Sequence, residues 1–552
     1  MRNKHLLLWS SLLTFALLAA AAVQENFFRE WRRVQSGASR PGAPAEVRLR
    51  QVYVPSLGAA DRCVSCHVGM APGEQAVAGH KVLGPHPRLA HDPADMGCTI
   101  CHGGQGRATD RADAHGEVPH WPEPMLPRRY AYAGCGGCHM PVGVPSAARL
   151  AAGAAVFERQ DCLACHKLDG RGGTVRPDGG GMEGPDLSAA GVRPVAAGWY
   201  ESHLDKSAKD AWPPWRGSVA PLSAPDREAL ATFLATRVGA PGLAEAKALF
   251  HALGCRGCHK VNGVGGADGP DLTREGRLDP GRLDFTHVPG GRSVPAWLAE
   301  HFRAPATLVA NSQMPALGLS ETEIDRLVFY LLSLRSSGPV GSAQPPDRLR
   351  VERFGAREFA TDGATLYGAF CSGCHGPNGE GMRYAGMAAF PAIGNPDFLA
   401  FASDDFLAAT IDRGRPGRRM PGWADPVSGL RPDERKAVLA YVRALGAGAA
   451  PVPSAAEPRR FVKQGLKGGD AIYARACAGC HGAKGQGAEG PALNNAVLLE
   501  SASDRYLVET IRRGRRGTSM EGFATPSTTR PVLADAEIES IVALLRTWEK
   551  TR

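Results

Sequence analysis

Seven short stretches of this 552-residue chain share the pattern Cys-x-x-Cys-His. The cysteine pairs, which together use all fourteen cysteines, are Cys63 and Cys66, Cys98 and Cys101, Cys135 and Cys138, Cys162 and Cys165, Cys255 and Cys258, Cys371 and Cys374, and Cys477 and Cys480. The histidines that follow them are His67, His102, His139, His166, His259, His375 and His481. Random order would give this pattern on the order of 0.01 times per chain, so its repetition has a chemical cause.

The pattern predicts covalently attached haem of the c type. Two thioethers join the cysteines to the porphyrin, and the adjacent histidine binds the iron as its proximal ligand. A zinc site would need a second ligand pair at finger-like spacing. A redox dithiol does not need the histidine, and disulfide scaffolds belong to much smaller domains. We therefore expect seven covalent haem c groups and assign no catalytic residue.

The first three motifs lie in residues 46–145, where hydrophobic periodicity is weak. Iron ligation is therefore expected to organise this trihaem domain more than a side-chain core does. We expect histidine on both faces of each iron, and the distal candidates are His86, His91, His115 and His120. His80 ranks last among the free histidines, at least one of which is a spectator. The methionines that stay open as alternatives are Met70, Met96, Met125 and Met140.

After residue 145 the chain repeats a unit in which one amphipathic helix runs into the motif and a second helix ends the unit. Four domains are predicted at residues 146–240, 241–338, 350–447 and 459–552, with linkers at 336–347 and 446–458. The last helices begin near Ser, Pro or Asp, which favour helix starts. The predicted fold is mainly α: an irregular trihaem segment and four tandem helical domains, with little or no β structure.

These four units resemble class I cytochrome c domains in helix order, motif position and spacing. Three carry "GPDL" or "GPAL" after the motif, at Gly184, Gly269 and Gly490, and the third unit has "FPAI" with Pro391 in that place. The resemblance implies that a proline carbonyl supports each proximal histidine. It also implies a distal methionine ahead of the last helix, and the matching residues are Met314, Met420 and Met520.

The first repeat departs from this pattern, because Ala220 aligns with Met314. Alanine cannot bind iron, so the haem on His166 is either five-coordinate or ligated from elsewhere. Met182 is an awkward candidate just before "GPDL". His203 is the leading alternative, although it matches His301 of a repeat that keeps its methionine, and a structural role for both histidines is the default.

The N-terminus contains an uncharged stretch of eighteen residues, Leu6 to Val23, after a basic start. This length lies between a long signal h-region and a short membrane span. Phe27, Phe28 and Trp31 stand beside arginines, as in an interfacial belt after a span. Residues 1–45 are therefore predicted to be an uncleaved anchor rather than a signal cleaved near Ala20 to Ala22. In both cases the haem domains are exported to the periplasm, here held at the inner membrane.

The formal net charge of +9 would suggest nucleic acid or anionic lipid as a partner. Each haem adds two propionates, and its ferric iron returns about one positive charge, so seven haems subtract roughly seven charges. The oxidised holoprotein is then near neutral, and no nucleic-acid partner is expected.

The N-terminal region adds a second resemblance. The run "VYVPSLGAADRCVSCHVGM … GPHPRLAHDPADMGCTICHGGQGRAT … AHGEVPHW" within residues 25–145 is similar to membrane-anchored multihaem cytochrome c subunits of menaquinol-oxidising, bc-like complexes. The resemblance implies a membrane cytochrome b-type, quinol-oxidising subunit as the partner.

Ligand chemistry predicts the direction of electron flow in this respiratory-chain role. Methionine ligation raises the reduction potential above that of bis-histidine ligation. Electrons should enter at the trihaem domain and leave from the C-terminal domains toward a soluble periplasmic cytochrome c or a similar acceptor. The alternative is a multihaem reductase or peroxidase with an open haem at His166, and an outer-surface conduit is a more remote one.

Overall fold

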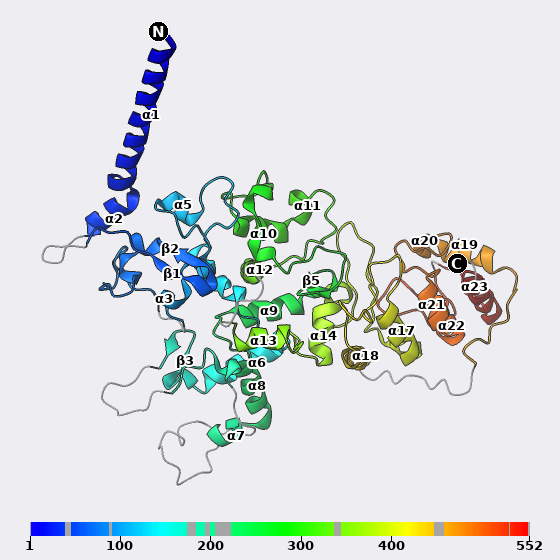
Figure 1. The fold of residues 1–552 in the computed structure, drawn as a ribbon. Coiled ribbons are helices and arrows are strands. Elements are labelled where there is room, and N and C mark those ends of the chain that lie inside the picture. Colours follow the sequence, from blue (N-terminus) through cyan, green and yellow to red (C-terminus); the bar gives the residue numbers. More distant parts are fainter. Residues whose placement is uncertain are drawn as a thin grey trace.

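The computed structural model describes residues 2–38, 46–87, 91–173, 184–193, 199–204, 222–335, 344–446, 458–528 and 530–549. This part of the chain is mainly helical (Figure 1). Its strands form three short antiparallel hairpins, which pair Val52–Val54 (β1) with Ala59–Asp61 (β2), Lys167–Leu168 (β3) with Arg171–Gly172 (β4), and Lys260–Val261 (β5) with Val264–Gly265 (β6). The prediction of a mainly α fold with little β structure is confirmed.

Helix α1 (Arg2–Phe27) stands away from the body of the protein at its N-terminal end (Figure 1). Within the described part of the chain, it belongs to the one candidate membrane span by length and apolar composition, Asn3–Ala38, whose most apolar window is 0% buried. An apolar helix of this length matches the hydrocarbon thickness of a bilayer. The helix thus supports membrane anchoring at the N-terminus.

Helix α2 (Glu30–Ala38) packs onto the trihaem domain. Trp31 is 6% exposed, although its neighbour Phe28 is 62% exposed. The Gln35 side chain donates a hydrogen bond to the Ser65 carbonyl at 2.8 Å. The predicted interfacial belt is therefore wrong for Trp31, because this indole is buried against protein and not available to lipid headgroups.

The trihaem domain consists of short elements joined by turns. Its helices are α3 (Pro93–Met96), α4 (Thr99–His102) and α5 (Arg111–His115), and a 3₁₀ segment, Arg128–Gly137, leads into the third motif. In the described residues, the core cluster of its N-terminal half consists of Val52, Val64 and Ala71, with Val54 and Met70 packed against it. Its C-terminal end is buried against the second tandem domain, where the Tyr130 hydroxyl donates to Asp325 at 2.6 Å.

Each tandem domain pairs the helix before its motif with its last helix. The pairs are α6 (Ala147–Arg159) with α8 (Ala224–Ala235), α9 (Leu243–Ala252) with α12 (Glu321–Ser333), α14 (Gly363–Phe370) with α18 (Pro432–Leu445), and α19 (Gly469–Ala476) with α23 (Asp535–Thr547). The remaining helices are α7 (Trp199–Leu204), α10 (Val294–Arg303), α11 (Pro305–Leu308), α13 (Pro346–Glu352), α15 (Ser372–His375), α16 (Pro396–Phe401), α17 (Asp404–Arg413), α20 (Ala478–His481), α21 (Ala496–Ser501) and α22 (Asp504–Arg513).

Glycine permits the close helix crossing in three of these pairs. A Cβ atom at Gly153 would lie 2.2 Å from the Ala229 carbonyl oxygen, and one at Gly469 would lie 2.2 Å from that of Ser540. In the third domain, Gly363 makes the same close approach to the backbone of the last helix. No real Cβ approaches backbone so closely, so a larger residue would push apart the two helices that lie behind the motif.

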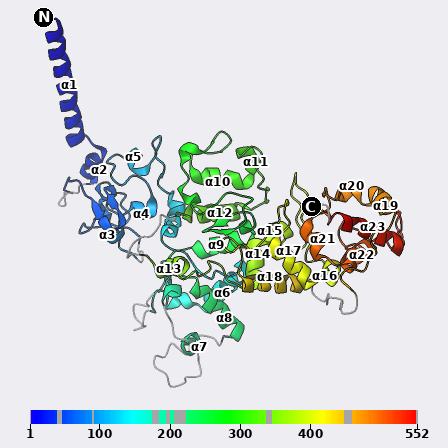
Figure 2. The same ribbon diagram turned by 45° about the vertical axis from the view of Figure 1, so that its right-hand side comes forward.

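The third and fourth domains face each other through equivalent surfaces, with α16 and α17 beside α21 and α22 (Figure 2). The Asn395 amide donates to the Arg516 carbonyl at 2.9 Å, and its counterpart Asn495 donates to the Pro416 carbonyl at 3.1 Å. The rings of Phe406 and its counterpart Tyr506 pack between them, with centroids 4.8 Å apart and an interplanar angle of 38°. This reciprocal contact is that of an internal pseudo-twofold pair, which shares one hydrophobic core.

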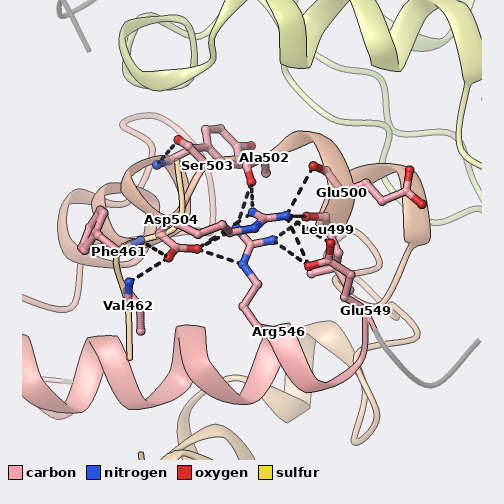
Figure 3. Close-up of polar contacts among 11 residues, drawn as sticks. Phe461, Val462, Leu499, Glu500, Ala502, Ser503, Asp504, Arg546 and Glu549 are labelled. Atoms are coloured by element: carbon pink, nitrogen blue, oxygen red, sulfur yellow. Dashed lines mark hydrogen bonds and ion pairs between the residues drawn. The ribbon is translucent and has the colours of Figure 1, made fainter. Parts of the chain in front are cut away.

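A buried arginine–aspartate pair organises the fourth domain (Figure 3). Asp504 is 0% exposed and accepts hydrogen bonds from the Arg546 Nε at 2.9 Å and from the Phe461 and Val462 amides. Asp504→Ala would leave the Arg546 guanidinium buried without its carboxylate, which is expected to destabilise this domain by about 3–5 kcal/mol.

The third domain supplies a matched control for this prediction. Arg443 donates to Asp404 at 2.7 Å in the equivalent place, but the Asp404 side chain is 68% exposed. Because exposed pairs contribute only about 0–1 kcal/mol, Asp404→Ala should barely shift the urea midpoint. Equal shifts for Asp404→Ala and Asp504→Ala in urea unfolding of the holoprotein would contradict the prediction.

Candidate haem sites

The backbone of every Cys-x-x-Cys-His motif forms the same single turn. The histidine amide donates to the carbonyl of the first cysteine at 2.8 to 3.0 Å in all seven copies. This i to i+4 bond brings both cysteines and the histidine to one side of the turn. All fourteen thiols are free of disulfides, and the part of the chain that the structure describes holds no group of three or more zinc-type ligands.

A proline carbonyl orients the motif histidine in each of the four tandem domains, as predicted. The Nδ1 atom of His166 lies 2.9 Å from the Pro185 oxygen, and that of His375 lies 2.8 Å from the Pro391 oxygen. The corresponding distances in the second and fourth domains are 2.9 Å, from His259 to Pro270, and 2.8 Å, from His481 to Pro491. Since Nδ1 donates to the carbonyl, Nε2 remains as the nitrogen that can bind iron, so the residues fit the cofactor.

The glycine before this proline has a steric role. A Cβ atom at Gly269 would lie 2.4 Å from the imidazole of His259, and one at Gly184 would lie 2.6 Å from that of His166. Gly490 is similarly close to His481. In the "GP" pair, the glycine therefore leaves room for the imidazole ring, and the proline carbonyl accepts a hydrogen bond from that ring.

Burial favours the neutral form of several motif imidazoles, which is the form that binds a metal. Burial lowers the pKa of His102, His259 and His375 below the ordinary histidine value. Burial is also the largest cause of the lowered pKa of His481.

The third motif has a different partner for its histidine. The Nδ1 atom of His139 lies 3.3 Å from a carboxylate oxygen of Asp347, and the Met140 amide donates to the same carboxylate at 2.7 Å. Asp347 is 1% exposed and lies 208 residues away along the chain. Sequence reasoning missed it, because Asp347 ends a stretch whose composition is typical of a linker. The residue that follows it, Arg348, is buried as well and donates to the Gly137 carbonyl at 2.6 Å.

Two of the predicted distal histidines stand opposite motif histidines. The ring centroids of His86 and His102 are 6.1 Å apart, and those of His91 and His139 are 6.0 Å apart. Burial first, and then the neighbouring His115, lowers the pKa of His67, so this third candidate lies near the first motif.

The other free histidines of the trihaem domain do not form such pairs. His120 is exposed, has a left-handed backbone with φ of 67°, and makes no ring contact with a motif histidine in the described residues. The His80 Nδ1 accepts from the Val82 and Leu83 amides at 3.1 and 3.0 Å and thereby holds a local turn. Of the four predicted distal ligands, His86 and His91 thus make a ring contact with a motif histidine in the described residues, whereas His115 and His120 make none.

The methionine loops of the third and fourth domains have the same backbone. The Arg415 amide donates to the Met420 carbonyl at 2.9 Å, and the Arg515 amide donates to the Met520 carbonyl at 2.6 Å. Met520 therefore occupies the same position as Met420 although no proline follows it. Met314 is half-buried and packs against the core of the second domain. Ligation by these three sulfurs stays a prediction, and Met182 and Ala220 lie outside the described residues.

Motifs that are distant in sequence touch one another. The Cys98 amide of the second motif donates to the Asp61 carboxylate, just before the first motif, at 2.5 Å. A Cβ atom at Gly254, just before the fifth motif, would lie 2.1 Å from the Gly373 amide nitrogen of the sixth. Between the second and third motifs, a Cβ atom at Gly134 would lie 1.8 Å from the Cys101 carbonyl oxygen, so only glycine permits this contact. The first motif thus meets the second, the second meets the third, and the fifth meets the sixth.

Comparison with known families gives matches over most of the tandem domains. A family model described as cytochrome c matches residues 150–237, 243–335 and 466–549. A model described as cytochrome c oxidase, cbb3-type, subunit III matches residues 358–442. The third tandem domain, which lacks the glycine of the "GP" pair, is therefore also the domain that matches a different family model.

Two curated relatives are subunits of cbb3-type cytochrome c oxidases. Subunit FixP of Bradyrhizobium diazoefficiens is 30% identical over 179 residues, which are 30% of this chain and 56% of the relative. Subunit CcoP of Rhodobacter capsulatus is 28% identical over 204 residues, which are 35% of this chain and 59% of the relative. The chain thus matches little more than half the length of these relatives. No solved structure matches it.

Proposed function

We propose that this multihaem c-type cytochrome carries electrons from a cytochrome b-type, quinol-oxidising membrane subunit to a soluble periplasmic acceptor. The succession of motif contacts is the observation that carries the proposal. The Cys98 amide donates to Asp61 beside the first motif, Gly134 lies against the Cys101 carbonyl, and Gly254 lies against Gly373 of the sixth motif. The motif cysteines attach the porphyrin edges, so neighbouring cofactors would lie edge to edge, as single-electron transfer requires.

The packing of the third motif supports continuity between the trihaem domain and the tandem domains. A Cβ atom at Gly136 would lie 2.2 Å from the Ser333 carbonyl oxygen, at the end of α12 in the second domain. Cys135 packs against the same core. In this proposal all seven motifs hold haem c, and electrons pass from the third motif to the fifth across this contact.

The two ends of the chain differ in ligand chemistry. Near the anchor, the ring pairs of His86 and His91 with motif histidines support bis-histidine ligation, which gives low potentials, and His115 is the corresponding candidate for the first haem. In the later domains, Met314, Met420 and Met520 would raise the potential. The gradient runs from the membrane toward the periplasmic acceptor.

Purification of the whole chain from membranes tests the proposal. We expect a b-type cytochrome to co-purify, seven haem masses per chain in mass spectrometry, and the lowest-potential signals in a redox titration to have bis-histidine character. If the haems of lowest potential lay in residues 350–552, the proposed direction of electron flow would be reversed. A preparation without any b-type cytochrome would reject the proposed electron donor.

A second candidate function follows from the match of residues 358–442 to an oxidase subunit model and from the FixP and CcoP similarity. In this case the pseudo-twofold domain pair would deliver electrons directly to a terminal oxidase. The same purification separates the two functions, since a haem–copper oxidase subunit would accompany the chain only in the second.

A further inference from the structure

The first tandem domain contains a facing pair of histidines that its repeat pattern does not explain. The ring centroids of His166 and His203 are 6.1 Å apart, with an angle of 58° between the ring planes. His166 is the motif histidine of this domain, and Ala220 stands where the other repeats have their methionine. Any ligand for the second face of this iron would therefore come from another element.

The spacing of this pair is that expected for two ligands of one metal. Metal–imidazole bonds are about 2 Å long and the ring centre lies roughly 1 Å beyond the nitrogen, so opposite ligands have centroids about 6 Å apart. The pairs in the trihaem domain are separated by 6.1 Å for His86 and His102 and by 6.0 Å for His91 and His139. The separation of 6.1 Å between His166 and His203 is within 0.1 Å of both.

The fold holds both rings of the pair in place. The Pro185 carbonyl lies 2.9 Å from the Nδ1 of His166 and fixes that ring. On α7, the indole of Trp199 stacks on His203 with centroids 4.5 Å apart and an interplanar angle of 12°. Leu204, the next residue, packs against the core of the first domain and anchors this short helix.

The second domain contains the same tryptophan–histidine stack, but, in the part of the chain that the structure describes, its histidine is not paired with the motif histidine. Trp297 and His301 stack in the same way, with centroids 5.0 Å apart and an interplanar angle of 9°. Within the described residues, His301 makes no ring contact with the motif histidine His259, and this domain keeps Met314. The stack is thus common to both domains, whereas the 6.1 Å pairing belongs to the domain that lacks the methionine.

We infer that His203 is the distal iron ligand of the haem attached at Cys162, Cys165 and His166. This haem is then six-coordinate and low-spin, and its potential is lower than those of the methionine-ligated haems of the other tandem domains. A closed iron also removes the open coordination position that a peroxidase or reductase would need. The inference rests on haem attachment at this motif and not on the identity of the electron donor or acceptor.

Spin-state measurements on the detergent-solubilised full chain test this assignment. In His203→Ala we expect one of the seven haems to become high-spin in the ferric EPR spectrum and to bind carbon monoxide when reduced. Added imidazole should restore the low-spin state by filling the vacated position. A wild-type chain that already has one high-spin, carbon monoxide-binding haem, unchanged by His203→Ala, would overturn the inference.

Two further variants separate ligation from a structural role. His301→Ala removes the equivalent stacked ring of the second domain and should leave every haem low-spin. A new high-spin signal in His301→Ala would show that loss of the stack alone changes the spin state, and it would overturn the inference. If His203→Ala is not matured, His203→Met should keep the low-spin state and raise the potential of one haem. An unchanged potential in His203→Met would reject His203 as a ligand, whatever partners co-purify with the chain.

Discussion

Replacing Glu358 with alanine is expected to destabilise the holoprotein by about 3–5 kcal/mol. Glu358 is 6% exposed and forms ion pairs with the buried Lys247 and, at 3.5 Å, with the buried Arg256. The Asn262 amide also donates to it at 2.7 Å. Removal of this carboxylate would leave two cations inside the protein without compensation, so a large downward shift of the urea midpoint should result.

The effect should extend across domains, because this cluster lies where three of them meet. Lys247 of the second domain also donates to the Pro141 carbonyl at the end of the trihaem domain, at 3.0 Å. An exposed ion pair supplies the control: Arg303 pairs with Glu321, whose side chain is 75% exposed. Glu321→Ala should change stability by about 0–1 kcal/mol, and an equal loss in both variants would contradict this account.

Because of Glu358, the interface between these domains is expected to be sensitive to acid. Burial alone would raise the pKa of Glu358, but the attraction of Lys247 and Arg256 outweighs it and lowers this pKa to about 2. A carboxyl whose folded pKa is depressed stabilises the protein above its unfolded pKa and loses that contribution as pH falls toward the folded value. Wild-type stability should therefore decline between about pH 4.5 and pH 2 by more than that of Glu358→Gln.

Asp347→Asn is expected to raise the reduction potential of the third haem by at least about 60 mV, which corresponds to about 1.4 kcal/mol for one electron. A carboxylate at 3.3 Å from the Nδ1 of His139 makes the imidazole a stronger donor to iron, and its buried negative charge favours the ferric state. Asparagine keeps the shape and can still accept a hydrogen bond, but it removes the charge.

Potentiometric titration, followed through the EPR signal of the third haem, measures this shift. Asp325→Asn is the matched control, because Asp325 is 56% exposed and accepts from the Tyr130 hydroxyl in the segment that leads into the same motif. It removes one charge from the same region without touching the ring. An unchanged or lowered potential in Asp347→Asn would show that Asp347 has only a structural role.

Local patterns in the chain predicted much of these sites. The seven Cys-x-x-Cys-His motifs, the helix pairs of the four tandem domains and the supporting prolines all appear where expected. Pro391 is an instructive case, because its carbonyl accepts from His375 at 2.8 Å although the usual preceding glycine is replaced by Phe390. Backbone geometry within one turn, or between a motif and a loop ten to twenty residues later, repeats with the sequence pattern.

Pairings between distant segments were not predictable in this way. His86 and His91 stand opposite motif histidines whereas His120 does not, although sequence reasoning treated them alike. Trp31 lies in a stretch whose composition is typical of a membrane interface, but its side chain is buried. In both cases the deciding factor is which surface the chain folds against, and local composition carries no information about that.

By itself, the sequence determined the c-type cytochrome character and the tandem helical domains, because these depend on residues close together in the chain, and it predicts seven attachment sites on the same basis. Only the tertiary structure decided that Asp347 supports His139, that His203 faces His166, and that motifs meet in succession. Those contacts join segments tens to hundreds of residues apart, and the packing of whole domains brings them within reach.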